Sequence, residues 1–145
     1  MRIFGHPVHP MLVHFPVAFW TVATGAYLWV ASDAGELVVV IAKLANSAGL
    51  IMAIVAMFAG LLELRSIDSD SDAMRVAIWH MMTMATVWVC FLLALMLSIS
   101  TAPDRAVMRF GEAVCAGVGF LLMAVGGWLG GRLIYEFGIA AKKDT

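Results

Sequence analysis

Four long apolar stretches, separated by short polar links, dominate the sequence. They run from about residue 11 to 31, 37 to 62, 73 to 99 and 107 to 135. Each holds the roughly 20 apolar residues that a helix needs to cross about 30 Å of hydrocarbon. In lipid such stretches must be helical, because no water is present to bond their backbone groups. The pattern therefore predicts four transmembrane helices.

The links between the stretches contain turn-forming residues. Residues 32–35 predict a turn, residues 68–72 a solvated link that also caps the third helix, and residues 100–104 the end of that helix. Short links make consecutive helices antiparallel neighbours. We therefore expect an all-α fold, in which residues 1–145 form one up-down-up-down four-helix transmembrane bundle.

Composition narrows the class of protein further. The chain is 63% hydrophobic and 13% charged, whereas soluble domains are roughly 45–50% apolar and about 25% charged. This excludes a soluble globular domain and a disordered chain. A net charge of −1 offers no basic surface for nucleic acid. A cleavable signal peptide is the competing interpretation of the first stretch, but its apolar run is longer than the usual core of about 7–15 residues.

The distribution of basic residues predicts the orientation. Four spans place both termini on one side, and that side collects six basic residues against three on the other. The positive-inside rule then favours cytoplasmic termini. The six are Arg2, Arg65, Arg75, Arg132, Lys142 and Lys143, and the three are Lys43, Arg105 and Arg109.

Small residues at four-residue spacing indicate close helix contacts. The fourth stretch has two overlapping pairs, Gly126 with Gly130 and Gly127 with Gly131. They are interpreted either as packing inside the bundle or as a surface for homodimerisation. A faint internal repeat also relates the first two stretches to the last two. It pairs His14 with His80, 66 positions apart, and residues 48–60 with residues 116–128, 68 positions apart.

All four histidines are expected at one membrane face. Ionisable groups inside a membrane are costly, so each is a hypothesis for a functional site. His14 and His80 lie within the first and third stretches at similar depth, and His6 and His9 lead into the first. Other polar residues expected at this face are Glu63, Arg132, Tyr135 and Glu136.

Three interpretations of this cluster stay open. The first is haem b with His14 and His80 as axial ligands, Arg132 or Arg75 pairing the propionates, and Tyr135 among the cofactor contacts. The second is a Zn, Cu or Fe ion, for which the ligands would come from His6, His9, His14, Glu63 and His80. The third is structural: Trp79, His9 and Tyr135 are interfacial anchors, His14 and His80 bond backbone carbonyls, and no ligand is bound. No nucleotide loop or catalytic motif is present, so no catalytic residue is predicted.

The N-terminal segment resembles the signature of a known family. Residues 5–17, GHPVHPMLVHFPV, are similar to the motif HPxHPxLVHFP of a bacterial four-helix membrane family, domain of unknown function 2231. Residues 60–63, His80 and the glycines of residues 126–131 agree in order, although Glu63 stands where the family tends to place Asp. The resemblance implies a multi-pass protein of the bacterial inner membrane. Family members joined to Rieske-type or c-type cytochrome domains further imply membrane electron transfer.

The function expected from the sequence is therefore a small electron-transfer subunit. It would bind one haem b near the cytoplasmic face and exchange electrons with a quinone or with a separate cytochrome c or Rieske-type protein. The alternative is a non-catalytic membrane subunit whose polar cluster is structural, docks a partner or binds a metal ion. A transporter is the third interpretation.

Overall fold

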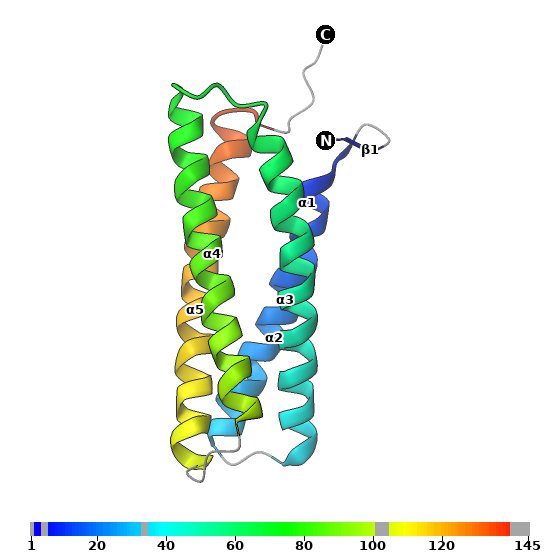
Figure 1. Ribbon diagram of the computed structural model, residues 1–145, viewed down its shortest axis with the longest axis vertical. Coiled ribbons are helices and arrows are strands. Elements are labelled where there is room, and N and C mark those ends of the chain that lie inside the picture. Colours follow the sequence, from blue (N-terminus) through cyan, green and yellow to red (C-terminus); the bar gives the residue numbers. More distant parts are fainter. Residues whose placement is uncertain (1, 4–5, 33–34, 101–104, 140–145) are drawn as a thin grey trace.

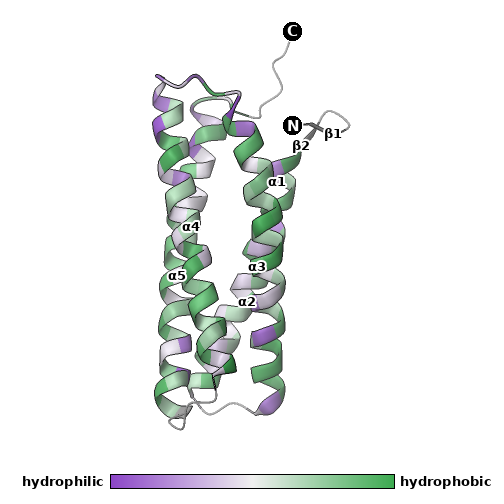
Figure 2. Ribbon diagram, viewed as in Figure 1, coloured by the Kyte–Doolittle hydropathy of each residue, from purple (hydrophilic) through white to green (hydrophobic). Residues whose placement is uncertain are grey.

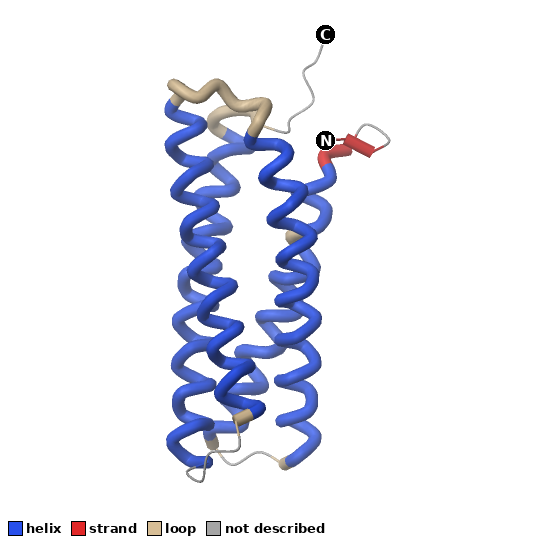
Figure 3. Tube along the Cα trace, in the orientation of Figure 1, coloured by secondary structure: helices blue, strands red, loops and turns tan. Residues whose placement is uncertain are grey.

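The protein is a bundle of four long antiparallel helices (Figure 1). The computed structural model describes residues 2–3, 6–32, 35–100 and 105–139. The long helices are α2 (His14–Ala31), α3 (Glu36–Leu64), α4 (Asp72–Ile99) and α5 (Arg105–Tyr135). A short helix, α1 (Val8–Leu12), leads into α2, and the two-residue strands β1 (Arg2–Ile3) and β2 (His6–Pro7) pair before it (Figure 3).

The four predicted spans coincide with the four long helical segments. Each segment, with α1 and α2 taken together, is long and apolar enough to cross a membrane. The predicted all-helical class with four membrane-spanning helices is confirmed. The described N-terminal strands, the α3–α4 link and the end of α5 lie at the same end of the bundle (Figure 1), as four spans require.

Proline explains the break between α1 and α2. Pro16 has no N–H to donate to the carbonyl of Leu12, and the helix is interrupted at Val13. Hydrogen bonds from Val13 to His9 and from Val17 to Val13 still join the two pieces. Val13 itself keeps helical backbone angles, so one helical phase runs through both pieces. It places His9 on the face of the buried Pro16 and Trp20, and His14 on the opposite, exposed face.

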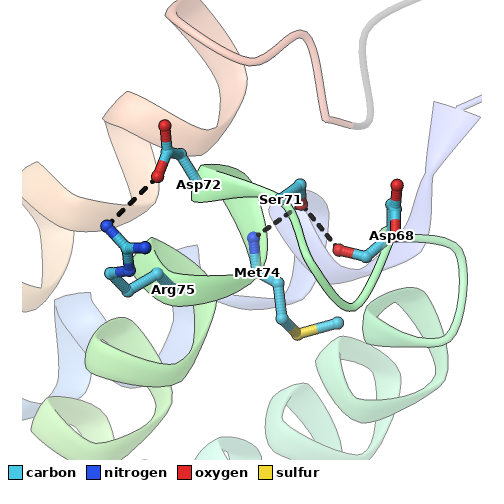
Figure 4. A network of polar contacts seen from close by, with 5 residues as sticks. All are labelled: Asp68, Ser71, Asp72, Met74 and Arg75. Atoms are coloured by element: carbon cyan, nitrogen blue, oxygen red, sulfur yellow. Dashed lines mark hydrogen bonds and ion pairs between the residues drawn. The ribbon is translucent and has the colours of Figure 1, made fainter.

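The α3–α4 link caps α4 as the sequence predicted. The hydroxyl of Ser71 accepts a hydrogen bond of 3.1 Å from the backbone N–H of Met74 and donates one of 2.6 Å to the carbonyl of Asp68 (Figure 4). Asp72 and Arg75 form an ion pair of 3.2 Å with both side chains largely exposed. Such a pair contributes little, so the Ser71 cap is the contact that defines the start of the helix.

The bundle is apolar on its outside as well as in its core. Figure 2 shows hydrophobic residues along the length of all four long helices, and many of the large ones are exposed. Leu44, Phe58 and Leu121 each expose about two thirds of their surface. Soluble proteins rarely expose contiguous apolar surface of this extent, whereas a lipid-facing helix requires it. The surface therefore agrees with the membrane assignment made from composition.

The centre of the core is a stack of two aromatic rings from α2 and α4. Trp20 and Phe91 are fully buried and lie parallel, with ring centroids 4.6 Å apart. Each ring lies against a glycine of the helix that follows it in the chain, Trp20 on Gly49 and Phe91 on Gly119. A side chain at either glycine would occupy the space of the ring, so glycine permits the close approach.

These contacts show that the two halves of the chain repeat each other. Trp20 and Phe91 are 71 positions apart, and Gly49 and Gly119 are 70 positions apart. The hairpin of α2 with α3 and the hairpin of α4 with α5 are thus related by a pseudo-two-fold axis along the bundle. The repeat inferred from the sequence exists, but its register of 66 to 68 positions is wrong. In the observed register the partner of His80 is His9.

The two overlapping glycine pairs of α5 have different environments. Gly126 lies against Met84, and Gly130 lies against His80. Gly127 is exposed and meets no neighbouring atom within 4 Å of its would-be Cβ, among the described part of the chain. The first pair therefore packs inside the bundle, and Gly127 faces outward.

We predict that Gly49→Ala destabilises the bundle. Its Cβ would lie 2.6 Å from Cδ1 of Trp20, and the buried, stacked ring has little freedom to move. Overpacking of this kind costs about 1–3 kcal/mol. Gly25→Ala is the matched control, because no described atom lies within 4 Å of its Cβ and alanine is the better helix former by up to about 1 kcal/mol. Thermal unfolding in detergent measures both, and equal stability of the two variants would contradict the packing of Trp20 on Gly49.

Candidate functional site

Two histidines face each other between the hairpins, near the end of the bundle that carries the α3–α4 link. Nδ1 of His9 lies 2.7 Å from the carbonyl oxygen of Ala56 on α3. Nδ1 of His80 lies 2.8 Å from the carbonyl oxygen of Gly126 on α5. Both histidines are partly buried. Each imidazole is thus bonded to the neighbouring helix of its own hairpin, at equivalent positions of the repeat.

The carbonyl partners determine the tautomer of both rings. A carbonyl oxygen only accepts hydrogen bonds, so Nδ1 of each histidine must carry a proton and donate it. In a neutral imidazole the proton on Nδ1 leaves a lone pair on Nε2. Both histidines therefore present Nε2 as a ligand atom or hydrogen-bond acceptor, held in orientation by the bond at Nδ1.

A glycine lies against each imidazole. A Cβ at Gly60 would be 3.0 Å from Cε1 and 3.1 Å from Nδ1 of His9. A Cβ at Gly130 would be 3.2 Å from Cε1 and 3.4 Å from Nδ1 of His80. Gly60 and Gly130 stand 70 positions apart, and each follows by four residues the one whose carbonyl bonds the ring. The local unit of histidine, carbonyl and glycine is therefore present twice.

The two rings meet across the pseudo-two-fold axis. Their centroids are 6.3 Å apart, and their planes make an angle of 83°. A metal bound by one nitrogen of each ring from opposite sides, at about 2.0–2.1 Å from both, would place the centroids roughly 6 to 6.5 Å apart. The observed separation fits one metal centre between two imidazoles.

His14 lies apart from this pair. Its side chain is exposed, and Nδ1 is 3.4 Å from the carbonyl of Met11 one turn earlier in the chain. The expected arrangement of His14 facing His80 is not found, because His14 lies on the exposed face of its helix and His9 lies on the face of the buried Pro16 and Trp20. The sequence had placed His9 only among the metal ligands and interfacial anchors. The side chain of His6 lies outside the described residues.

Arg132 and Tyr135, the other expected cofactor contacts, lie at the bundle surface. The guanidinium of Arg132 is 2.8 Å from a carboxylate oxygen of Glu136 and 5.3 Å from the ring centre of Trp128. Its hydrogen bonds lower the pKa of Glu136 below the usual value. Tyr135 is 89% exposed. Neither side chain shows a contact with the histidine pair.

The metal set predicted from the sequence does not assemble in the described part of the chain. No three His, Cys, Asp or Glu side chains there are arranged to hold a metal ion. Glu63 lies in the last turn of α3 and is half-buried. Among the predicted ligands whose side chains the structure describes, His9 and His80 lie side by side.

A second buried polar group, which the sequence did not single out, lies toward the other end of the bundle. Nδ2 of Asn46 donates to the hydroxyl of Tyr27 at 3.1 Å and to the carbonyl of Phe91 at 2.9 Å. The Tyr27 hydroxyl also interacts with Ser98 and lies in the electrostatic field of Glu112. The sequence signal that could have identified this group is a single Asn within an apolar span, since a buried amide needs partners on neighbouring helices.

Comparison with known proteins places the chain in a family. The profile of the family described as "Predicted membrane protein (DUF2231)" matches residues 5–143. The chain belongs to this family. The match includes both histidines of the pair and both glycines beside them, and it agrees with the resemblance found in the N-terminal motif. Searches of curated proteins and of solved structures find no significant match.

We predict that His9 and His80 carry their proton on Nδ1. In protein with ¹⁵N-labelled histidine at mildly alkaline pH, both rings should give the nitrogen shifts of the Nδ1–H tautomer, because each bonds a carbonyl through Nδ1. His14→Ala should leave these signals unchanged, whereas His9→Ala and His80→Ala should each remove one of them. A predominant Nε2–H form at either position would contradict the two carbonyl bonds.

Proposed function

We propose that this protein is a membrane electron-transfer subunit that binds one haem b with His9 and His80 as axial ligands. The observation that carries the proposal is the pair itself: two imidazoles 6.3 Å apart, each oriented by a hydrogen bond from Nδ1 to a backbone carbonyl. A histidine that binds a metal through one nitrogen commonly donates the other N–H to such an acceptor.

The number of ligands favours haem over a bare metal ion. Protein sites for Zn, Cu or Fe ions use three or four side-chain ligands. Haem brings four nitrogens of its own and needs one or two axial ligands from the protein. Among the described residues, the two imidazoles have no third ligand clustered with them. Two ligands match the number that haem needs from the protein.

The remaining residues of the site also suit a bound haem. Haem held by His9 and His80 would supply one-electron redox chemistry. The Nδ1–H bonds fix the direction of both rings and, in a neutral imidazole, leave the lone pair of Nε2 for a metal. Gly60 and Gly130 leave the space that each ring occupies. Arg132, at the bundle surface, would reach a propionate only by leaving Glu136.

Location and partners complete the proposal. The site lies toward the end with the α3–α4 link, which the distribution of basic residues assigns to the cytoplasmic side, in the bacterial inner membrane. The electron partner would be a quinone or a cytochrome c or Rieske-type protein. A homodimer through α5 would use the face with Gly127, because Gly126 and Gly130 pack against α4.

The test is an absorption spectrum of protein purified from haem-replete cells. We expect a Soret band that shifts on reduction with dithionite, and a low-spin signature of two imidazole ligands. His9→Ala and His80→Ala should each lower the bound haem at least about tenfold, because one axial bond and its anchoring carbonyl contact are lost. Gly130→Ala should weaken binding less, since it only displaces the His80 ring.

His14→Ala is the matched control. It removes an exposed imidazole and should leave the spectrum unchanged. Loss of haem in His14→Ala with retention in His9→Ala would restore the ligand pair expected from the sequence and overturn the present one. A colourless protein from haem-replete cells would overturn haem binding altogether, and metal analysis of the same sample would test for a Zn, Cu or Fe ion.

A structural role for the histidine pair is the second candidate, and the same hydrogen bonds favour it. Each ring joins two helices of one hairpin, and a buried polar group bonded across helices stabilises a membrane bundle by about 0.6 kcal/mol on average. Under this function His9→Ala and His80→Ala would lower the thermal stability of a protein that is colourless in its native form.

A further inference from the structure

The core contains two polar atoms that protein groups leave without a partner. Among the described side chains, Nε1 of Trp20 and Oδ1 of Asn46 are the buried polar atoms with no hydrogen bond. Both residues are 0% exposed. One atom is a donor and the other an acceptor. Each unmet group of this kind costs about 1–3 kcal/mol, and neither atom can reach solvent.

The two atoms lie beside the same turn of α3. Nε1 of Trp20 is 2.7 Å from the position that a Cβ of Gly49 would take. Asn46 precedes Gly49 by three residues, which places the two positions on one helix face with Cβ sites about 5–6 Å apart. Asn46 also bonds the carbonyl of Phe91, whose ring stacks on Trp20. The orphaned donor and the orphaned acceptor therefore belong to one local cluster.

We propose that Trp20 and Asn46 bind one water molecule inside the bundle. Water accepts from the indole N–H and donates to the amide oxygen, so a single molecule satisfies both atoms. Buried waters in proteins typically hold such otherwise unpaired groups. The fully buried side chains and the close contact of Trp20 with Gly49 favour a ligand of this size over a larger alcohol or quinol.

The site extends a polar chain across the hairpins. From the water, the series of hydrogen bonds passes through Asn46 to the hydroxyl of Tyr27 and on to Ser98, which donates to the carbonyl of Leu95. It links α2, α3 and α4. Asn46 corresponds to Ala116 in the repeat, so this water site occurs in one half only. It is independent of the histidine pair and of any cofactor bound there.

The experiment is magnetisation transfer between water and the tryptophan indole N–H groups, with the full chain in lipid nanodiscs. Trp20, identified by loss of its signal in Trp20→Phe, should show a direct cross peak with water despite being fully buried. Trp88 is the internal control, because its Nε1 donates to the carbonyl of Leu50 at 3.2 Å, and it should show none. Absence of the Trp20 cross peak would overturn the proposal.

Asn46 variants test the second contact. Asn46→Leu removes the acceptor and should reduce the Trp20 cross peak at least about fivefold, while an unchanged Trp88 signal shows that the bundle is folded. Asn46→Asp keeps an acceptor oxygen and should keep the cross peak. A cross peak that persists in Asn46→Leu would overturn the shared site. If the Nε1–H of Trp20 is hydrogen-bonded but gives no cross peak with water, its partner is a molecule other than water, and this result would also overturn the proposal.

Discussion

In a membrane-spanning bundle, a polar group in the interior must be hydrogen-bonded by the protein or by a water molecule held inside it. This constraint sets the geometry of both polar sites described above. At one end, His9 and His80 satisfy Nδ1 on backbone carbonyls of α3 and α5. A helical carbonyl already accepts an N–H from the next turn, so each imidazole uses its second lone pair. The rings can approach those carbonyls because glycine stands four residues further along each helix.

The pseudo-two-fold repeat explains why the histidines meet. Each hairpin alone holds one imidazole against its second helix, and pairing of the hairpins across the axis brings the imidazoles to 6.3 Å. The same operation brings Trp20 onto Phe91 deeper in the bundle. Toward the far end the symmetry is lost, since Asn46 and Tyr27 correspond to Ala116 and Ser98. The symmetric end suits a ligand with two equivalent coordination sites, and the asymmetric end suits a single polar molecule.

Hydropathy was enough to predict the fold, because lipid leaves a long apolar segment no alternative to a helix. The four spans and the Ser71 cap of α4 follow from local sequence alone. The identity of the inward histidine did not follow. Helical phase puts His9 on one face with Trp20 and His14 on another with Ala18, but a lipid-facing helix is apolar all round, so hydropathy does not show which face is inward. The register of the repeat was also missed, since few residues are identical between the halves. The correct register is given by glycines 70 positions apart, whereas the sequence analysis aligned the two histidines that lie 66 positions apart.

The two sites are separate along the bundle, and this separation shapes what each can do. His9 and Trp20 are eleven positions apart, or about 16 Å along the helix, with the α1–α2 break between them. The histidine pair lies toward the end of the bundle that carries the α3–α4 link, where the proposed cofactor would be within reach of a partner protein. The Trp20–Asn46 cluster is enclosed by helices on all sides and cannot exchange a large ligand. Chemistry that requires a partner therefore belongs to the histidine end. The enclosed cluster instead holds α2, α3 and α4 together, which keeps the two hairpins, and with them the two imidazoles, in register.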